Sequence, residues 1–428
     1  MRATFAVLLL AALALVAVHA ETLRSEPTVA VPPPADEAVV PEVDVSVGLA
    51  QREIFGMALA ALVIFVAAGG GTGGGGVLDP IYILVMGLDA KTAIPLSSIT
   101  ILGGAIGNFF MNLRRTRDNS TEPLIDWDVI LVMQPLLLLG ASCGTFLNAI
   151  MPTWLLCILL VLILSVTGTR TLQKAIKARQ QERWQCGVSP EATSLLGVDS
   201  SKVHISEQKV YRADVPWGKL ATLGSLFTVV AGMRILRGGE NFDSPMGINP
   251  SSTLHPVLVA LPYVILVIIS FFSLKNLRAT YEKQQSPGYE FGTHEIKWTA
   301  SSIRFFPMSS LAAGAASGMF GIGGGIINGP LLLEVGIDPS AASAMTAATV
   351  LFSSGMSSLN YAAMGKLNLD LAQLMLPMGF LTTYVGHACL LKIVRHYNCP
   401  SMIIFSMAVI VLVSAFAMSI ESVRALLA

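Results

Sequence analysis

The sequence predicts an all-α polytopic membrane protein built from two inverted repeats, each with a glycine-broken helix. Three observations lead to this fold class. Hydrophobic residues fill 53% of the 428 positions and charged residues only 13%, about half the share in soluble domains. The apolar residues gather in runs of about 20, the length of a membrane-spanning helix. Two glycine-rich motifs, 71–75 and 321–325, recur in the same context.

The composition excludes a soluble enzyme, a disordered chain and a disulfide scaffold. The 27 basic and 27 acidic residues balance, so no net charge attracts nucleic acid. The five cysteines form no C-x-x-C motif, and no cysteine or histidine spacing fits a metal site. We therefore expect no enzyme activity, no cofactor or metal, and no nucleic-acid partner.

The first 53 residues contain two segments outside the helical repeats. Residues 1–20 combine Arg2, an apolar run and the small residue Ala20, which indicates a secretory signal peptide. An uncleaved first membrane helix is the alternative. Residues 21–53 hold seven acidic and two basic residues among prolines and valines, which predicts a disordered, non-cytosolic tail. The signal directs the chain to the plasma membrane or an endomembrane.

Lipid offers the backbone no hydrogen bonds, so the spanning segments must be helices. About eight apolar runs are long enough to be full spans. They are 92–113, 128–150, 152–169, 218–238, 256–274, 340–362, 370–391 and 400–420. Two further stretches, 54–86 and 303–335, are interrupted by glycine near the middle. Each of these predicts either two half-helices in a re-entrant hairpin or a full span followed by a half-helix.

Lysine and arginine clusters follow four of these runs and place those ends in the cytosol. The runs are 92–113, 152–169, 256–274 and 370–391. This divides the membrane part into a first repeat (54–169), a cytosolic loop (170–217), linking helices and loops (218–302), and a second repeat (303–428). The loop is either a solvated linker or a regulatory segment. The sequon at Asn119 falls in the cytosol and should carry no glycan.

The two glycine motifs belong to a longer internal repeat. Aligning 71–75 with 321–325 places Pro80 on Pro330. Further matches in the same order are Ser97 with Thr346, Thr100 with Thr349, Asn112 with Asn360, Asp128 with Asp370, Pro135 with Pro377 and Gly144 with Gly386. Matched order over some hundred residues indicates duplication. The first copy has arginines where the second has only Lys366, which predicts that the second copy is inverted, as in many secondary transporters.

The glycine runs predict breaks in helices and, at these breaks, an anion site. A glycine costs up to about 1 kcal/mol in a helix relative to alanine, and the half-helix after a break starts with unpaired N–H groups and a partial positive charge. Two facing breaks would bind a small oxyanion; close helix packing is the alternative use of glycine. The candidate substrate-binding residues are Gly71, Gly73, Gly74, Gly75, Pro80, Ser97, Thr100, Gly321, Gly323, Gly324, Gly325, Asn328, Pro330, Thr346 and Thr349.

Ionisable residues at membrane depth are rare and often functional. Asp79 and Glu334 are the candidates for proton coupling, although Asp79 could instead cap the half-helix that follows it. Arg234, near the end of the 218–238 run, either attracts anions or extends to the membrane surface. Transport without a coupling ion is a further alternative, and the oligomeric state is open.

The doubled motif resembles that of the TauE/SafE sulfite exporter family. The cleaner copy runs from Gly318-Met319-Phe320-Gly321-Ile322-Gly323-Gly324-Gly325 to Pro330, and each copy is followed by G-x-D and a helix with serine or threonine. The resemblance covers 54–170 and 303–420, and the signal, tail and loop are similar to the eukaryotic branch. It implies transport of sulfite, an organosulfonate or a related sulfur anion, with the matching glycines and prolines in pore-lining broken helices.

The sequence therefore predicts a secondary transporter for a small sulfur-containing anion within the lipid bilayer. An anion channel or a membrane scaffold without transport is the alternative. An intramembrane hydrolase is a third, because residues 140–144 read G-x-S-x-G. That motif requires a strand-to-helix turn, whereas here it falls within a predicted helix.

Overall fold

The computed structural model describes residues 45–68, 74–117, 122–187, 215–239, 244–245, 254–286, 298, 300–397 and a few positions between 408 and 419. The chain divides into two units, 1–51 and 52–428, and the contacts below lie in the second. The predictions for the signal peptide, Asn119, Gly71 and Gly73 lie outside the described residues, as does most of the predicted 400–420 span.

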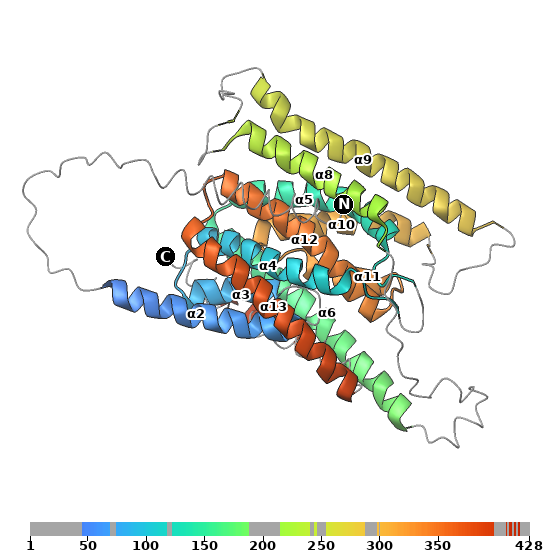
Figure 1. Ribbon diagram of the computed structural model, residues 1–428, viewed down its shortest axis with the longest axis horizontal. Helices are drawn as coiled ribbons and strands as arrows, with labels where there is room; N and C mark the ends of the chain where they lie inside the picture. Colours follow the sequence, from blue (N-terminus) through green and yellow to red (C-terminus); the bar gives the residue numbers. More distant parts are fainter. Residues whose placement is uncertain are drawn as a thin grey trace, which may run out of the picture. The chain divides into compact units, whose positions relative to one another are not determined.

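Every regular element in the described residues is helical, apart from a single β-bridge between Thr116 and Pro123. Figure 1 shows their arrangement. The elements are α2 (Val45–Ala67), α3 (Gly75–Pro80), the π-helix η2 (Ile81–Val85), α4 (Ala90–Asn112), α5 (Trp127–Ile150), α6 (Thr153–Gly187), α8 (Trp217–Arg237), α9 (Leu254–Gln284), α10 (Ala300–Phe320), α11 (Gly325–Glu334), α12 (Pro339–Ala363) and α13 (Leu369–Tyr397).

Four helices, α4, α5, α8 and α12, match the predicted runs to within two residues at each end. Three others continue beyond them: α6 to Gly187, α9 to Gln284 and α13 to Tyr397. The extension of α6 is rich in lysine, arginine, glutamine and alanine, which favour helix in water as well. The first part of the predicted loop 170–217 is therefore helical. So is the end of the predicted disordered tail, because α2 starts at Val45.

The two glycine-interrupted stretches share one form. In each, a helix of more than 20 residues, α2 or α10, is followed by a short one. The short segment is α3 with η2 in the first stretch and α11 in the second. Each stretch is therefore one long helix followed by a short one, and α2 and α10 are not among the described helices that are long and apolar enough to cross a membrane.

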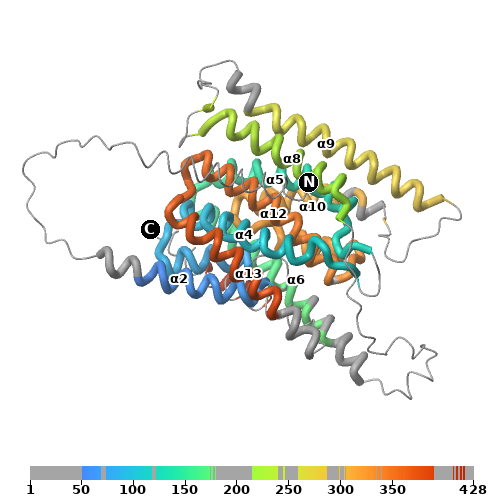
Figure 2. The backbone as a smooth tube through the Cα atoms, viewed as in Figure 1, coloured from blue at the N-terminus to red at the C-terminus, as the bar shows by residue number. Residues whose placement is uncertain are grey.

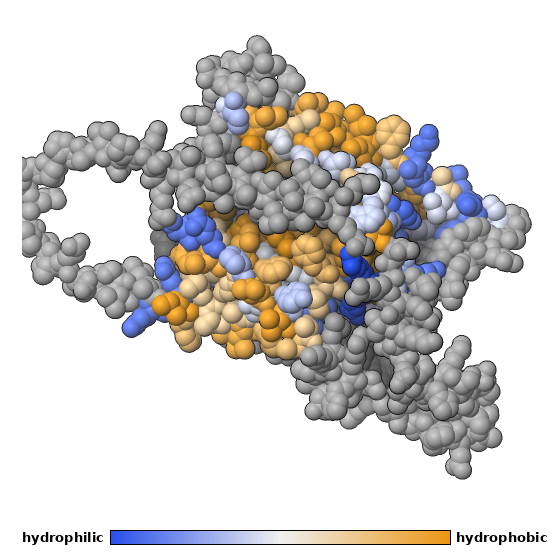
Figure 3. Space-filling view, viewed as in Figure 1, coloured by the Kyte–Doolittle hydropathy of each residue, from blue (hydrophilic) through white to orange (hydrophobic). Residues whose placement is uncertain are grey.

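Five of the described helices are long and apolar enough to cross a membrane: α4, α5, α8, most of α9 and the first part of α6. Their burial differs widely. In the most apolar part of α4, 89% of the residues are buried, against 11% in the most apolar part of α9. The side chains of Phe271 and Phe272 in α9 are exposed. In Figure 3, apolar residues predominate over the middle of α9 on the side in view. Such a face suits lipid rather than water.

The helices pack in two sets: α4, α5, α10, α12 and α13 form the first, and α8 and α9 form the second. In the first set, α4 contacts α12 and α13, and α5 contacts α10 and α12. The helices α8 and α9 pack against each other and against α5; Figure 2 traces both sets. The short helices α3 and α11 contact each other. The glycine breaks therefore lie within the packed helices and not on the lipid-facing side.

Glycines also bring long helices together. In α5, a Cβ at Gly140 or Gly144 would overlap the backbone of α10, and one at Gly314 or Gly318 of α10 would overlap the backbone of α5. The pair α4 and α13 has the same kind of contact, between Gly103 and Gly379 and the opposite backbones. At these positions glycine serves close helix packing, the alternative that the sequence left open.

Candidate functional site

Both short helices begin after glycines with left-handed backbone. Gly74 precedes α3 with φ of 74°, and Gly324 precedes α11 with φ of 68°. Gly321 and Gly323, in the same break, have φ of 66° and 71°. Residues with a Cβ atom rarely adopt this conformation. The glycine sequence therefore ends α10 and starts α11 after four non-helical residues.

The two breaks lie against each other. A Cβ atom at Gly75 would overlap the carbonyl oxygen of Ile322, so the two backbones are in direct contact. A Cβ at Gly76 would lie 2.6 Å from Cδ1 of Ile326. Only a residue without a side chain allows this approach. The sequence predicted that these motifs meet only because they belong to two repeats. In the structure, residues some 250 positions apart in the chain are in contact.

Serines from the neighbouring helices bind the carbonyl groups of the second break. Ser97 Oγ of α4 donates to the carbonyl of Gly321 at 3.3 Å. Ser353 Oγ of α12 donates to the carbonyl of Gly323 at 3.0 Å. These bonds satisfy backbone acceptors that lipid could not. They also attach the break to both long helices of the core.

The amide groups at the start of α11 face the same region. The N–H groups of Ile327 and Asn328 donate to the carbonyl of Gly324, at 3.2 and 3.0 Å. The amides of Gly325 and Ile326 come before these first intrahelical donors, as in any helix N-terminus. Such amides and the helix dipole favour a negative ligand. The chemistry at the break is therefore suited to an anion.

Three predicted polar residues gather beside α11. Asn328 Nδ2 donates to Thr349 Oγ1 at 3.4 Å. Thr346 Oγ1 would lie 3.6 Å from a Cβ at Gly329. Among the described residues, Asn328 Oδ1 and Thr346 Oγ1 have no hydrogen-bond partner, and both side chains are buried. Buried polar atoms are normally paired, so these two atoms mark a place for water or a ligand.

Thr100, by contrast, is already engaged. Its hydroxyl is 2.9 Å from the hydroxyl of Tyr82 and donates to the carbonyl of Leu96 at 2.7 Å.

The two prolines of the motif lie within the short helices. After Pro80 the chain forms the π-helix η2, in which the N–H of Met86 donates to the carbonyl of Ile81 at 3.2 Å. Pro330 lies in the middle of α11.

Asp79 is the one predicted coupling residue whose side chain is described. It is fully buried in α3 and lies near Ser97. The Ser97 hydroxyl donates to the carbonyls of Ile94 and Gly321. Neither carboxyl oxygen has a hydrogen-bond partner among the described residues. It does not cap α3, which starts four residues earlier at Gly75. An ionised carboxylate is costly at this depth. Glu334 ends α11, but its side chain lies outside the described part.

The sequence missed several residues around the breaks. Tyr361 of α12 donates its hydroxyl to the carbonyl of Gly318, and Asn360 Nδ2 donates to Thr145 Oγ1 at 3.1 Å. Ser353 was also missed, although it lies on the same face of α12 as Thr346 and Thr349. Their spacing of three and four residues was the available signal. Nothing in the sequence identified the partners on α5 and α10.

The G-x-S-x-G motif has no nucleophile elbow. Ser142 lies well inside α5, with eight helical residues after it. The motif's two glycines are those that pack against α10. No strand-to-helix turn surrounds the serine, so the geometry of this motif is that of helix packing.

Known proteins are similar to this chain over most of its length. A sequence model described as "Sulfite exporter TauE/SafE" matches residues 55–233 and 192–420. Sulfite exporter TauE/SafE family protein 5 of Arabidopsis thaliana is 30% identical over 357 residues, covering 80% of this chain and 77% of the relative. Family protein 2 of the same plant is 28% identical, covering 80% and 77%. No solved structure matches.

Proposed function

Because the chain belongs to the TauE/SafE sulfite exporter family, we propose that it is a secondary transporter for a small sulfur-containing anion such as sulfite or an organosulfonate. The chain is an integral, multi-pass membrane protein of a transporter family. The observation that carries the proposal is the contact between Gly75 and the carbonyl of Ile322. It joins two broken helices inside the packed core, where an anion would find backbone amides.

In this proposal the anion binds between the two breaks and not at a lysine or arginine. The groups that would bind it are the backbone amides of Gly71, Gly73, Gly74 and Gly75 in the first break and Gly321, Gly323, Gly324 and Gly325 in the second. Asn328 and Thr346 support this position, because each has a buried polar atom without a partner in the described part of the chain. The serines that bind the break carbonyls would preserve the geometry.

We further propose that the two repeats are inverted and exchange access by moving against each other. Equivalent helices have equivalent contacts: α4 packs on α13, and the aligned helix α12 packs on α5. The two central contacts, α4 with α12 and α3 with α11, each join one helix to its own counterpart. A two-fold relation between the copies accounts for this pattern. Asp79 and Glu334 would carry a coupling proton.

The test is flux of labelled sulfite into proteoliposomes, with sulfate and thiosulfate as competitors. Saturable flux of a sulfur anion supports a transporter, and non-saturating current would indicate a channel. Gly323→Val should abolish flux, because a side chain there would meet Ile101 and Val350 at 2.8 and 3.0 Å and strain a φ of 71°. Gly75→Val should do the same through the Ile322 carbonyl.

The matched control is Gly232→Val in α8, where a Cβ would meet nothing within 4 Å. This variant should transport like the wild type. All three variants are compared at equal amounts of folded protein, judged by size-exclusion chromatography in detergent. Wild-type flux in both Gly323→Val and Gly75→Val would remove the proposed mechanism.

A further inference from the structure

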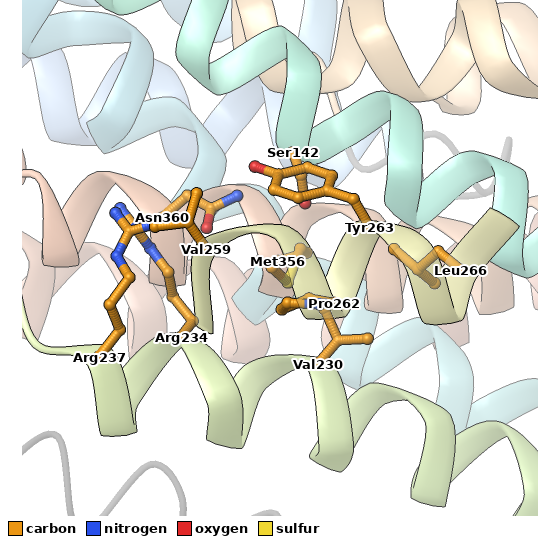
Figure 4. A pocket seen from close by; sticks show the side chains of 10 residues that line it. All are labelled: Ser142, Val230, Arg234, Arg237, Val259, Pro262, Tyr263, Leu266, Met356 and Asn360. Carbon is orange, nitrogen blue, oxygen red and sulfur yellow. The ribbon is translucent and has the colours of Figure 1, made fainter. Parts of the chain in front are cut away.

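A pocket lined by both charged and apolar residues lies where four helices meet, away from the glycine breaks. It is lined by Arg234 and Arg237 of α8, Tyr263 of α9, Ser142 of α5 and Asn360 of α12, among others. Figure 4 shows the two guanidinium groups directed toward the Asn360 side, with the Tyr263 hydroxyl near Ser142. The sequence left open whether Arg234 attracts anions or extends to the surface. The structure places it in this pocket.

The charge in the pocket is uncompensated by its neighbours in the described structure. Arg234 and Arg237 are three residues apart and therefore share one face of α8. Both are half-buried, and no described carboxylate forms an ion pair with either one. Arg234 Nε is buried without a hydrogen-bond partner among the described residues. Two like charges held together in partial burial repel each other, and a bound anion removes that cost.

The remaining polar groups suit an oxyanion. The tyrosine and serine hydroxyls and the asparagine amide can all donate hydrogen bonds, and a guanidinium fits a planar or tetrahedral oxyanion with paired N–H groups. The cavity volume is about 20 Å³. That is slightly more than one water molecule requires. Even a small inorganic oxyanion is larger than a water molecule, so it would bind only after the half-buried arginine side chains move apart, and a bulky organic anion would need a larger change.

The pocket and the second glycine break both contact the same face of α12. Ser353, which binds the carbonyl of Gly323, is followed at spacings of three and seven residues by Met356 and Asn360, which line the pocket. Seven residues of helix rise about 10 Å. The pocket and the second break are therefore about 10 Å apart along α12.

The first repeat has a related arrangement. Asn112 of α4 aligns with Asn360, and Arg115 Nη1 donates to Asn112 Oδ1 at 2.9 Å. An arginine thus lies beside the matching asparagine at the same end of the equivalent helix in each copy. In the second copy the arginines come from α8, outside the repeat. There they line the same pocket as Asn360, whose amide group donates to Thr145.

We propose that the pocket of Arg234, Arg237, Tyr263, Ser142 and Asn360 binds a small oxyanion and supplies it to the glycine breaks. The inference rests on the proposed transport function. It adds a second binding position with fixed positive charge, which the breaks lack. Loss of the arginines should therefore weaken capture and leave the translocation step unchanged.

The first experiment measures flux against sulfite concentration in neutral phosphatidylcholine proteoliposomes. The double variant Arg234→Gln/Arg237→Gln should raise KM by about tenfold, the effect of losing one good charge-assisted contact, with kcat within twofold. Arg234→Lys should fall between it and the wild type. The matched control is Lys219→Gln on the same helix, which removes a cation paired with Asp128 at 2.6 Å. Its KM should not change.

The second experiment measures binding without transport. In the Gly323→Val protein, sulfite should raise the melting temperature saturably, and the double arginine variant should abolish that rise. If Gly323→Val transports normally, the central site fails, but this binding test still decides the pocket. An unchanged KM, a loss of kcat at constant KM, or an unchanged thermal shift in the arginine variant would each overturn the proposal. So would a thermal shift that requires added phosphatidylglycerol, because the arginines would then bind a lipid headgroup.

Discussion

Asp79 and Gly329 occupy matching positions in the aligned repeats and differ in what they would present to an anion. Asp79 is fully buried without a hydrogen-bond partner in the described structure, whereas Gly329 has the Thr346 hydroxyl as its neighbour. A carboxyl group that holds its proton donates a hydrogen bond, and one that has lost it repels an anion. At this position the first repeat can therefore link protonation to anion binding, whereas the matching glycine of the second repeat cannot.

We expect Asp79→Asn to flatten the pH dependence of sulfite flux, leaving only the part that comes from protonation of sulfite itself. The amide is nearly the same size as the carboxyl group but cannot exchange a proton. The measurement is initial flux in proteoliposomes at a series of pH values with equal pH on both sides. The matched control is Asp89→Asn, an exposed residue that accepts a bond from the N–H of Lys91 at 3.1 Å at the start of α4. A pH profile of Asp79→Asn equal to that of the wild type would exclude this role.

Helix pairs in this protein owe their close approach to glycines placed four residues apart. Gly140 and Gly144 of α5 lie against Gly314 and Gly318 of α10, so backbone contacts backbone. Lipid gives no hydrophobic drive for helix association, and tight packing of small residues takes its place. Glycines in the breaks have a different effect on the helix. There, consecutive glycines unwind the helix, whereas spaced glycines leave it intact.

We expect Gly314→Leu to destabilise the protein by at least about 1–3 kcal/mol, the usual cost of overpacking. The added side chain would overlap the backbone of α5 at Leu137. Fluorescence-detected size-exclusion chromatography after heating in detergent measures the fall in melting temperature. Gly232→Leu in α8, which has open space around it, should leave the melting temperature unchanged. Equal melting temperatures for both variants would contradict this contact.

At the scale of the whole molecule, the proposed inversion of the repeats makes a prediction about membrane sides. Asp89 and Asp338 precede α4 and α12, which align in the repeat, and both aspartates are exposed. In a parallel duplication they would lie on the same side of the membrane. In an inverted one they lie on opposite sides.

We expect Asp89→Cys and Asp338→Cys, each in a chain with its five native cysteines replaced by serine, to react with a membrane-impermeant maleimide from opposite sides. Asp89→Cys should react from outside intact cells and Asp338→Cys only after permeabilisation. Each variant is checked first for sulfite flux. Labelling of both from the same side would exclude the inversion.

Much of the fold was open to prediction because its causes are local in the chain. A run of about 20 apolar residues must become a helix in lipid, whichever helices surround it. The positions of α4, α5, α8 and α12 therefore followed from the sequence to within two residues. The ends of helices that continue into water were harder to predict. The helix α6, for example, continues beyond the apolar run through polar residues that favour helix, and a hydropathy pattern does not indicate where such a helix ends.

The glycine motifs show where local reasoning ends. Consecutive glycines in 321–325 predicted a break from backbone entropy and sterics alone, properties that belong to each residue. The contact of Gly75 with Ile322, the serines on the break carbonyls, and Arg234 beside Asn360 each join residues from separate helices. These depend on how the helices pack in three dimensions, because helix–helix distances in a membrane protein are set by side-chain fit across the whole bundle. The sequence therefore predicted the breaks and the anion site proposed at them, and only the packing brought Arg234 and Arg237 into one pocket with Asn360.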